Sequence, residues 1–165
     1  MRTIPVLNSL LRIAYAAKAD DDLTPLRVQK LLYHVHGWYL AIVNQSLFDE
    51  AFVAGRYGPE LQSLHTTLAQ YRGVPVDDYI QEFDADACKV GNFLVNEERY
   101  PQFSTIAKRV FDTHRHLTTA QLSTLCHADG SAWARTAQGQ PLDNALIRED
   151  FIRIAWKNEN QGKTG

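Results

Sequence analysis

Apolar residues recur at steps of three and four along the first third of the chain, which is the spacing of an amphipathic helix. One such stripe follows Thr3 and predicts a first helix that packs on one face only. Two adjacent stripes between about Pro25 and Asn44 predict a longer, central helix that packs on more than one side. Gly37 in its middle weakens this helix by about 1 kcal/mol relative to Ala, so we predict that a neighbouring helix crosses closely there.

Polar residues mark where several helices begin and end. The acidic run at residues 20–22 closes the first helix, and Thr24 followed by Pro25 opens the second with a capping hydroxyl and a proline in the first turn. Thr118, with Gln121 three residues later, predicts a capping box at the start of another helix.

In the remaining segments the spacing of apolar residues and the positions of Gly and Pro predict the structure. Residues 47–57 are too short and irregular for a helix and predict extended or hairpin-like structure, whereas residues 74–99 show no sustained period and lead to no prediction. A helix over residues 59–72 is predicted to begin at Pro59 and end at Gly73, and another covers residues 101–114. A short helix capped by Ser131 should end near Gly139, and a last helix includes residues 147–156.

Together these elements predict a mainly α fold, a compact single-domain bundle of about six or seven helices with a short extended or hairpin segment near residues 47–57. A chain of 165 residues has the size of one domain and buries about 70% of its unfolded surface. No repeat and no Pro/Gly/Ser-rich linker divides it. We therefore expect one helical domain over residues 1–157, followed by a flexible C-terminal tail over residues 158–165.

Composition narrows the class of protein. No apolar run approaches the roughly 20 residues that a membrane span needs, and the first residues lack the apolar run of a secretory signal. Cys88 and Cys126 lie in different segments, so neither a disulfide framework nor a zinc ribbon is encoded. We therefore expect a cytoplasmic protein. Its net charge of −2 is opposite to the basic excess that neutralises phosphates, so nucleic acid is not expected as the main partner.

The charge is nevertheless uneven along the chain. Residues 77–99 hold seven acidic residues against Lys89 and Arg99, a net charge of −5. This segment is either a solvated loop or a surface that complements a basic partner. The acidic residues that we single out as candidate partner contacts are Asp77, Asp78, Glu82, Asp84 and Asp86.

Aromatic residues gather between positions 33 and 57. Core packing explains such a cluster, but Tyr and Trp are also favoured interface anchors because they combine a large contact area with a polar group. Tyr33, Trp38 and Tyr57 are therefore further candidates for partner binding.

No residue pattern specifies a catalytic or metal site. His34 and His36, like His114 and His116, are two positions apart and so point in different directions on a helix, whereas a two-histidine metal motif needs a spacing of four. Adjacency of Cys126 to a histidine does not create a nucleophile and its base, which must meet through the fold. We predict no catalytic residue, no metal and no cofactor.

Three blocks of sequence carry a resemblance to a known family. Residues 23–33 and 37–41 resemble the opening signature of the Panacea domain, the SocA-like family of antitoxins and phage-associated proteins. Residues 47–61 resemble its next segment, with Glu60 where the family commonly has valine, and residues 117–133 resemble a later one. The positions that match the family motifs, and for which the resemblance implies a structural role, are Thr24, Gln29, Lys30, Leu31, Gly58, Pro59, His127 and Trp133.

The resemblance implies a helical antitoxin that neutralises a cognate toxin by direct contact. Members of the family are paired with many unrelated toxins, and one acts as a proteolytic adaptor that presents its toxin to a protease. Three alternatives therefore stay open: such an adaptor, a hydrolase or nuclease whose residues meet only in the fold, and a DNA-binding helix-turn-helix over residues 118–137. The last is weak because its second helix offers Arg135 as the only basic residue.

Overall fold

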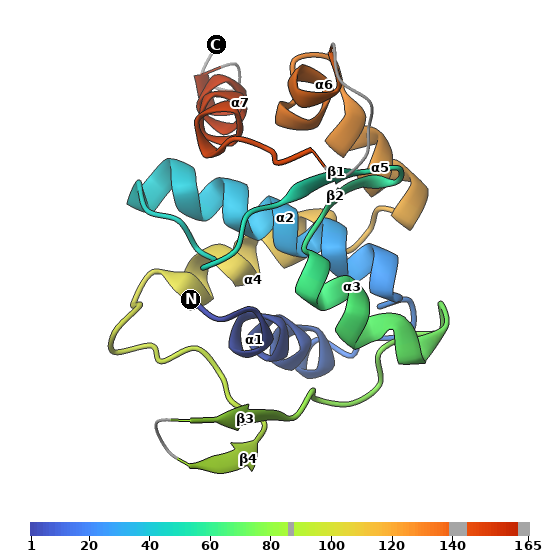
Figure 1. Cartoon of the computed structure of the whole chain (residues 1–165), viewed down its shortest axis with the longest axis vertical. Helices are drawn as coiled ribbons and strands as arrows, with labels where there is room; N and C mark the ends of the chain where they lie inside the picture. The colour runs from blue at the N-terminus through green and yellow to red at the C-terminus, as the bar shows by residue number, and fades with distance from the viewer. Residues whose placement is uncertain (86–87, 139–144, 162–165) are drawn as a thin grey trace.

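The computed structural model describes residues 1–85, 88–138 and 145–161, and within these it contains seven α-helices, a short 3₁₀ helix and two small antiparallel hairpins (Figure 1). The α-helices are α1 (Thr3–Ala16), α2 (Pro25–Val43), α3 (Gln62–Leu68), α4 (Phe103–His114), α5 (Thr119–His127), α6 (Ala132–Ala137) and α7 (Glu149–Gln161). The 3₁₀ helix η1 is Ala69–Tyr71, and the strands are β1 (Val53–Gly55), β2 (Gly58–Glu60), β3 (Glu82–Asp84) and β4 (Lys89–Gly91). The fold is mainly α, as the sequence predicts.

Helix α2 lies at the centre of the molecule (Figure 1). It contacts α1, α3, α4, α5, α7 and β2. Its side chains are buried almost continuously from Arg27 to Gly37, which explains the two apolar stripes. The prediction of a central helix that packs on several sides is confirmed.

Gly37 is the point where α7 crosses α2. A Cβ atom placed on Gly37 would lie 2.3 Å from Cε2 of Trp156, so only a glycine lets the indole ring approach this closely. The predicted helix crossing is therefore confirmed, and its partner is the last helix of the chain.

The predicted helix caps are present. The Thr24 hydroxyl accepts a hydrogen bond from the Arg27 N–H, and Pro25 occupies the first turn of α2. Thr118 and Gln121 form the full capping box of α5, with bonds of 2.8 and 3.2 Å. The Ser131 hydroxyl likewise caps α6, whereas Gly139, predicted to end that helix, lies outside the described residues.

The third helix is shorter than predicted. Pro59 does not open it but lies in β2, paired with Ala54 of β1, and α3 begins at Gln62. Gly58 adopts a φ of 106°, which sends the chain back along β1 in a hairpin instead of into a helical turn. The extended segment expected at residues 47–57 is thus a hairpin, displaced to residues 53–60. At the far end Gly73 follows η1 with a φ of 89°, consistent with its predicted role as terminator.

The β3–β4 hairpin occupies the segment for which the sequence predicts nothing. It lies beside α1, away from β1 and β2 (Figure 1). Two buried polar residues of α1 hold the flanking loops: the Asn8 amide bonds the backbone of Ile80 and Phe93, and the Ser9 hydroxyl accepts from the Val95 N–H.

A short return segment joins the bundle to α7. The Ala54 N–H donates to Ala145 O and the Ile147 N–H donates to Phe52 O, each at 2.8 Å, so this segment lies against β1. Helix α7 then runs to Gln161, into the stretch expected as a tail. None of the helices in the described part of the chain is long and apolar enough to cross a membrane.

Candidate functional site

The residues that match the family motifs meet around the β1–β2 hairpin. Lys30 on α2 is fully buried, and its Nζ donates to the carbonyl of Pro59 at 3.0 Å. Burial lowers the pKa of Lys30 to about 8, although Cys126 and Glu60 oppose this shift. A buried amine with a backbone acceptor therefore ties β2 to the central helix.

Gln29, the neighbouring motif residue, makes a two-bond clamp. Its Nε2 donates to Leu61 O and its Oε1 accepts from the Leu61 N–H, both at 3.0 Å and both buried. Leu61 lies between β2 and α3, so the clamp fixes the place where the hairpin ends and α3 begins. The two residues are 32 positions apart, so no local pattern predicts this contact, and the family motif is the only feature of the sequence that singles out Gln29.

Two further motif residues, Trp133 on α6 and His127 on α5, lie against the hairpin. The indole N–H of Trp133 donates to Gly55 O at 3.0 Å, and the Trp133 ring packs edge-on against His127 with centroids 4.1 Å apart. A Cβ atom on Gly58 would lie 3.1 Å from Lys30 Nζ and 3.3 Å from His127 Cε1. Gly58 is therefore required both by its positive φ and by the close approach of α2 and α5.

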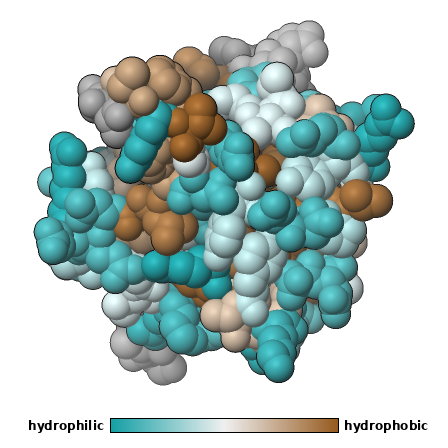
Figure 2. Space-filling model, turned by 90° about the horizontal axis from the view of Figure 1, so that it is seen from below, coloured by the Kyte–Doolittle hydropathy of each residue, from teal (hydrophilic) through white to brown (hydrophobic). Residues whose placement is uncertain are grey.

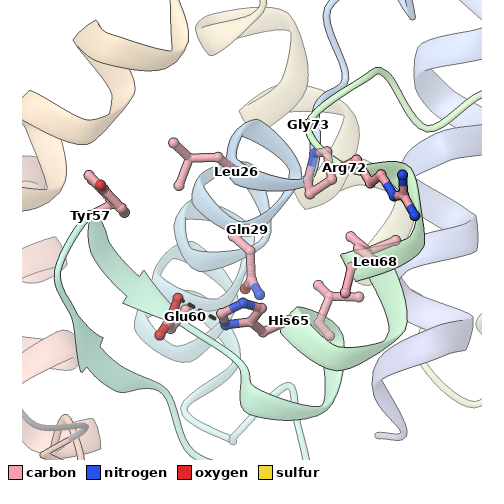
Figure 3. A pocket seen from close by; sticks show the side chains of 11 residues that line it. Leu26, Gln29, Tyr57, Glu60, His65, Leu68, Arg72 and Gly73 are labelled. Carbon is pink, nitrogen blue, oxygen red and sulfur yellow. Dashed lines mark ion pairs between the residues drawn. The ribbon is translucent and has the colours of Figure 1, made fainter.

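A hollow of about 360 Å³ opens beside this hairpin (Figure 3). Apolar side chains from α2 and α3 line it together with Gln29, and Tyr57 and Arg72 lie on opposite sides of it. Glu60 and His65 face each other across 3.8 Å at its edge. The residues that line it are Pro25, Leu26, Gln29, Tyr57, Glu60, Leu64, His65, Leu68, Ala69, Arg72 and Gly73. Among the candidate partner contacts that the structure describes, Tyr57 is the one that lines it.

The three aromatic candidates have different surroundings. Tyr33 is only 1% exposed and packs edge-on against Phe52 and Trp156, so it is a core residue and not a surface anchor. Trp38 is half-buried against the core. Tyr57, at the hairpin turn, is 60% exposed and is the aromatic candidate best placed to touch a partner.

The acidic candidates are not one surface. Asp77 and Asp78 are exposed, but Glu82 and Asp84 turn toward α1, where Arg2 lies 3.5 and 2.8 Å from their carboxylates. Asp86 lies outside the described residues. Figure 2 shows this lower side of the molecule, where hydrophobic patches lie between hydrophilic side chains. Glu82 and Asp84 share the single positive charge of Arg2, so they are less available to a partner than Asp77 and Asp78, and their role as partner contacts stays a prediction.

A cluster of titratable groups lies inside the bundle. Cys126 Sγ is 3.8 Å from His34 Nε2, and the His34 ring stacks on His114. Burial raises the pKa of Cys126 to about 12 and, with His114 nearby, lowers the pKa of His34 to about 3. Both shifts favour the neutral thiol and the neutral imidazole, the states of packed side chains and not of an activated nucleophile with its base.

No metal centre emerges from the described residues: they contain no group of three or more His, Cys, Asp or Glu side chains placed to hold an ion. His36, which the sequence sets apart from His34, packs instead between Phe48 and Phe52. Burial lowers the pKa of His36 to about 4.

Two comparisons with known proteins identify the family of the chain. The chain is 27% identical over 126 residues to a protein named Antitoxin SocA from Caulobacter vibrioides, a match that covers 75% of this chain. It spans 65% of the length of that relative. No solved structure matches the chain. The family described as "Antitoxin SocA-like, Panacea domain" matches residues 28–134, from α2 to α6, and the chain belongs to this family.

Proposed function

We propose that the chain is an antitoxin that acts in the cytoplasm by binding a cognate toxin directly, protein to protein. Membership of the SocA-like Panacea family, over residues 28–134, is the observation that carries the proposal. The antitoxin role is that of the family, and direct binding is our step beyond it.

The arrangement of the motif residues supports a binding role. Lys30 and Trp133 bond the backbone of the β1–β2 hairpin, and Gln29 bonds the backbone of Leu61, which follows it, so their polar groups are occupied in building the scaffold. Because these internal contacts fix the scaffold, the exposed residues can change from one relative to another and so fit different partners. Contact with the toxin is then made by exposed groups around the hairpin, among which Tyr57 is the most exposed aromatic ring.

Co-expression tests the proposal. The protein encoded next to this chain is expressed from an inducible promoter, with or without the chain from a second promoter, and growth is followed. We expect growth arrest by the neighbour alone, rescue by the chain, and a complex of both proteins that survives gel filtration. The amount of the neighbouring protein is measured by immunoblot, because rescue through lower expression would not support binding.

Two results would count against the proposal. If the neighbour is harmless when expressed alone, there is no toxin to neutralise. If the chain restores growth while the neighbour disappears and no stable complex forms, then delivery to a protease replaces neutralisation by binding. Repeating the experiment in a protease-deficient host separates the two: rescue by direct binding persists there, whereas rescue by degradation is lost.

A further inference from the structure

The hollow beside the β1–β2 hairpin, here called the α2–α3 groove, is open and largely apolar. Leu26, Leu64 and Leu68, here called its floor, line it, and the last two belong to α3. Seven residues of α-helix rise roughly 10 Å, which is the length of two turns. The groove therefore has room for two neighbouring apolar side chains of a partner, as in the docking of an amphipathic segment.

Two exposed arginines, Arg72 and Arg56, lie on or next to the lining of the groove. Arg72 lines the groove on the side opposite Tyr57 and is exposed (Figure 3). Arg56 is not a lining residue, but it is exposed and its guanidinium is 5.6 Å from the centre of the Tyr57 ring, which does line the groove. Neither arginine makes an ion pair with a carboxylate among the described residues. Of the carboxylates, Glu60 also lines the groove, 3.8 Å from His65.

We infer that the α2–α3 groove binds an apolar segment of the toxin that carries carboxylates on both sides of its apolar residues. This inference rests on the proposed function and specifies its contact. Apolar side chains of the segment fill the floor, and its carboxylates meet Arg56 and Arg72. Tyr57 covers one end of the segment, as exposed aromatic anchors do at interfaces.

A second copy of this chain fits the groove less well. In a two-fold symmetric contact the same groove of each copy would face the other, which would bring the arginines of one copy toward those of the other. A toxin segment of opposite charge avoids this repulsion. Dimerisation is thus an outcome that the experiment must be able to report.

Charge reversal and filling of the groove test the inference with the toxin identified by co-expression. The double variant Arg56→Glu/Arg72→Glu reverses both charges, and Ala69→Trp fills the space at an exposed lining position. The matched control is Arg99→Glu/Arg109→Glu: both arginines are exposed, and Arg99 lies 5.5 Å from the Tyr100 ring, much as Arg56 lies by Tyr57. Circular dichroism and thermal melting establish that each variant is folded.

We expect each groove variant to raise the dissociation constant by at least roughly tenfold, while the control stays within about twofold. Charge reversal should act mainly by slowing association at low salt, and Ala69→Trp mainly by speeding dissociation. Folded groove variants that bind like the wild type would overturn the inference and leave the antitoxin function standing. A wild type that binds no toxin would overturn both.

A photo-crosslinking residue in place of Ala69 gives a second, independent measurement. The segment of the toxin captured there should contain Asp or Glu on both sides of apolar residues. Capture of a basic segment would contradict the inference, as would capture of a second copy of this chain. Light scattering on the same sample shows which of these assemblies is present.

Discussion

The two hairpins in the described part of the chain have strands of equal length but opposite surroundings. In the strands β1 and β2 every residue except Glu60 is buried. In β3–β4 no residue is buried, and the cross-strand pair Phe83 and Val90 is 59% and 64% exposed. Equal strand length therefore does not mean equal attachment to the core.

The difference lies in what holds each hairpin. The backbone of β1–β2 receives hydrogen bonds from side chains of α2 and α6, including Lys30 and Trp133, in buried or half-buried surroundings. The strands of β3–β4 are tied to α1 by Arg2, whose side chain is 47% exposed. Because polar contacts are worth more where water is excluded, the first hairpin is part of the core and the second is an appendage.

Replacing Gln29 with Leu should produce the largest loss of stability. The Leu61 N–H would lose its acceptor inside the protein, and both bonds of the clamp would disappear. An unpaired buried donor together with the lost bonds predicts a fall of roughly 2–4 kcal/mol in the free energy of unfolding. Urea unfolding of the variant measures this fall. Gln62→Leu, at an exposed position of α3, is the control and should change stability by less than about 0.5 kcal/mol.

Because Lys30, which holds the buried β1–β2 hairpin, has a lowered pKa, we expect the free energy of unfolding to depend on pH. Its pKa is about 8 in the folded chain against an ordinary value of 10.5, so between these values the unfolded chain holds a proton that the folded chain has lost. Stability therefore rises with pH in this window. From about pH 7 to about pH 9.5 this contribution amounts to roughly 2 kcal/mol, and Lys30→Met should abolish it.

Urea unfolding at the two pH values, for wild type and variant, checks this prediction. Lys108→Met, at an exposed lysine of α4, serves as control and should keep the pH dependence of the wild type. If the free energy of unfolding rises with pH by the same amount in Lys30→Met and in the wild type, the buried amine is not the group responsible.

Local signals explain what could be predicted from the sequence. The caps at Thr24 and Thr118 involve residues three positions apart, so their patterns are legible without the fold. The prediction that Pro59 opens a helix is wrong because proline suits both the first turn of a helix and a strand position that donates no ladder hydrogen bond. What decides between these is the Lys30 bond to its carbonyl and the pairing with Ala54, both contacts that only the fold creates.

The β3–β4 hairpin escaped prediction for a different reason. Its alternation is reversed: the acidic Glu82 and Asp84 point inward to Arg2, while the apolar Phe83 points to solvent. A rule that places apolar residues inside cannot find such a strand. The α2–α3 groove also has no local signal, because it joins residues from Pro25 to Gly73 on separate elements.

Arg2→Ala should detach the exposed hairpin with little effect on the rest. Arg2 opposes the rise that burial gives to the pKa of Glu82, and without it Glu82 and Asp84 would be half-buried like charges. Exposed pairs are worth about 0.2–1 kcal/mol, so global stability should fall by no more than that. Hydrogen exchange should instead become faster over β3 and β4 and stay unchanged over β1 and β2. Faster exchange in both hairpins would mean that they are coupled through α1.

The smallest effect is expected at the outer face of the same hairpin, in the double variant Phe83→Ser/Val90→Ser. Both side chains are more than half exposed, so folding removes little of their apolar area from water, and stability should change by less than about 0.5 kcal/mol. The matched variant in the other hairpin is Val53→Ser, where the side chain is 5% exposed, and there we expect a loss of about 2 kcal/mol or more. Affinity for the toxin should also be unchanged in Phe83→Ser/Val90→Ser, because the α2–α3 groove lies on other elements. A folded double variant that no longer binds the toxin would move the contact from the groove to the exposed hairpin, and would show that the less attached of the two hairpins is the one that recognises the partner.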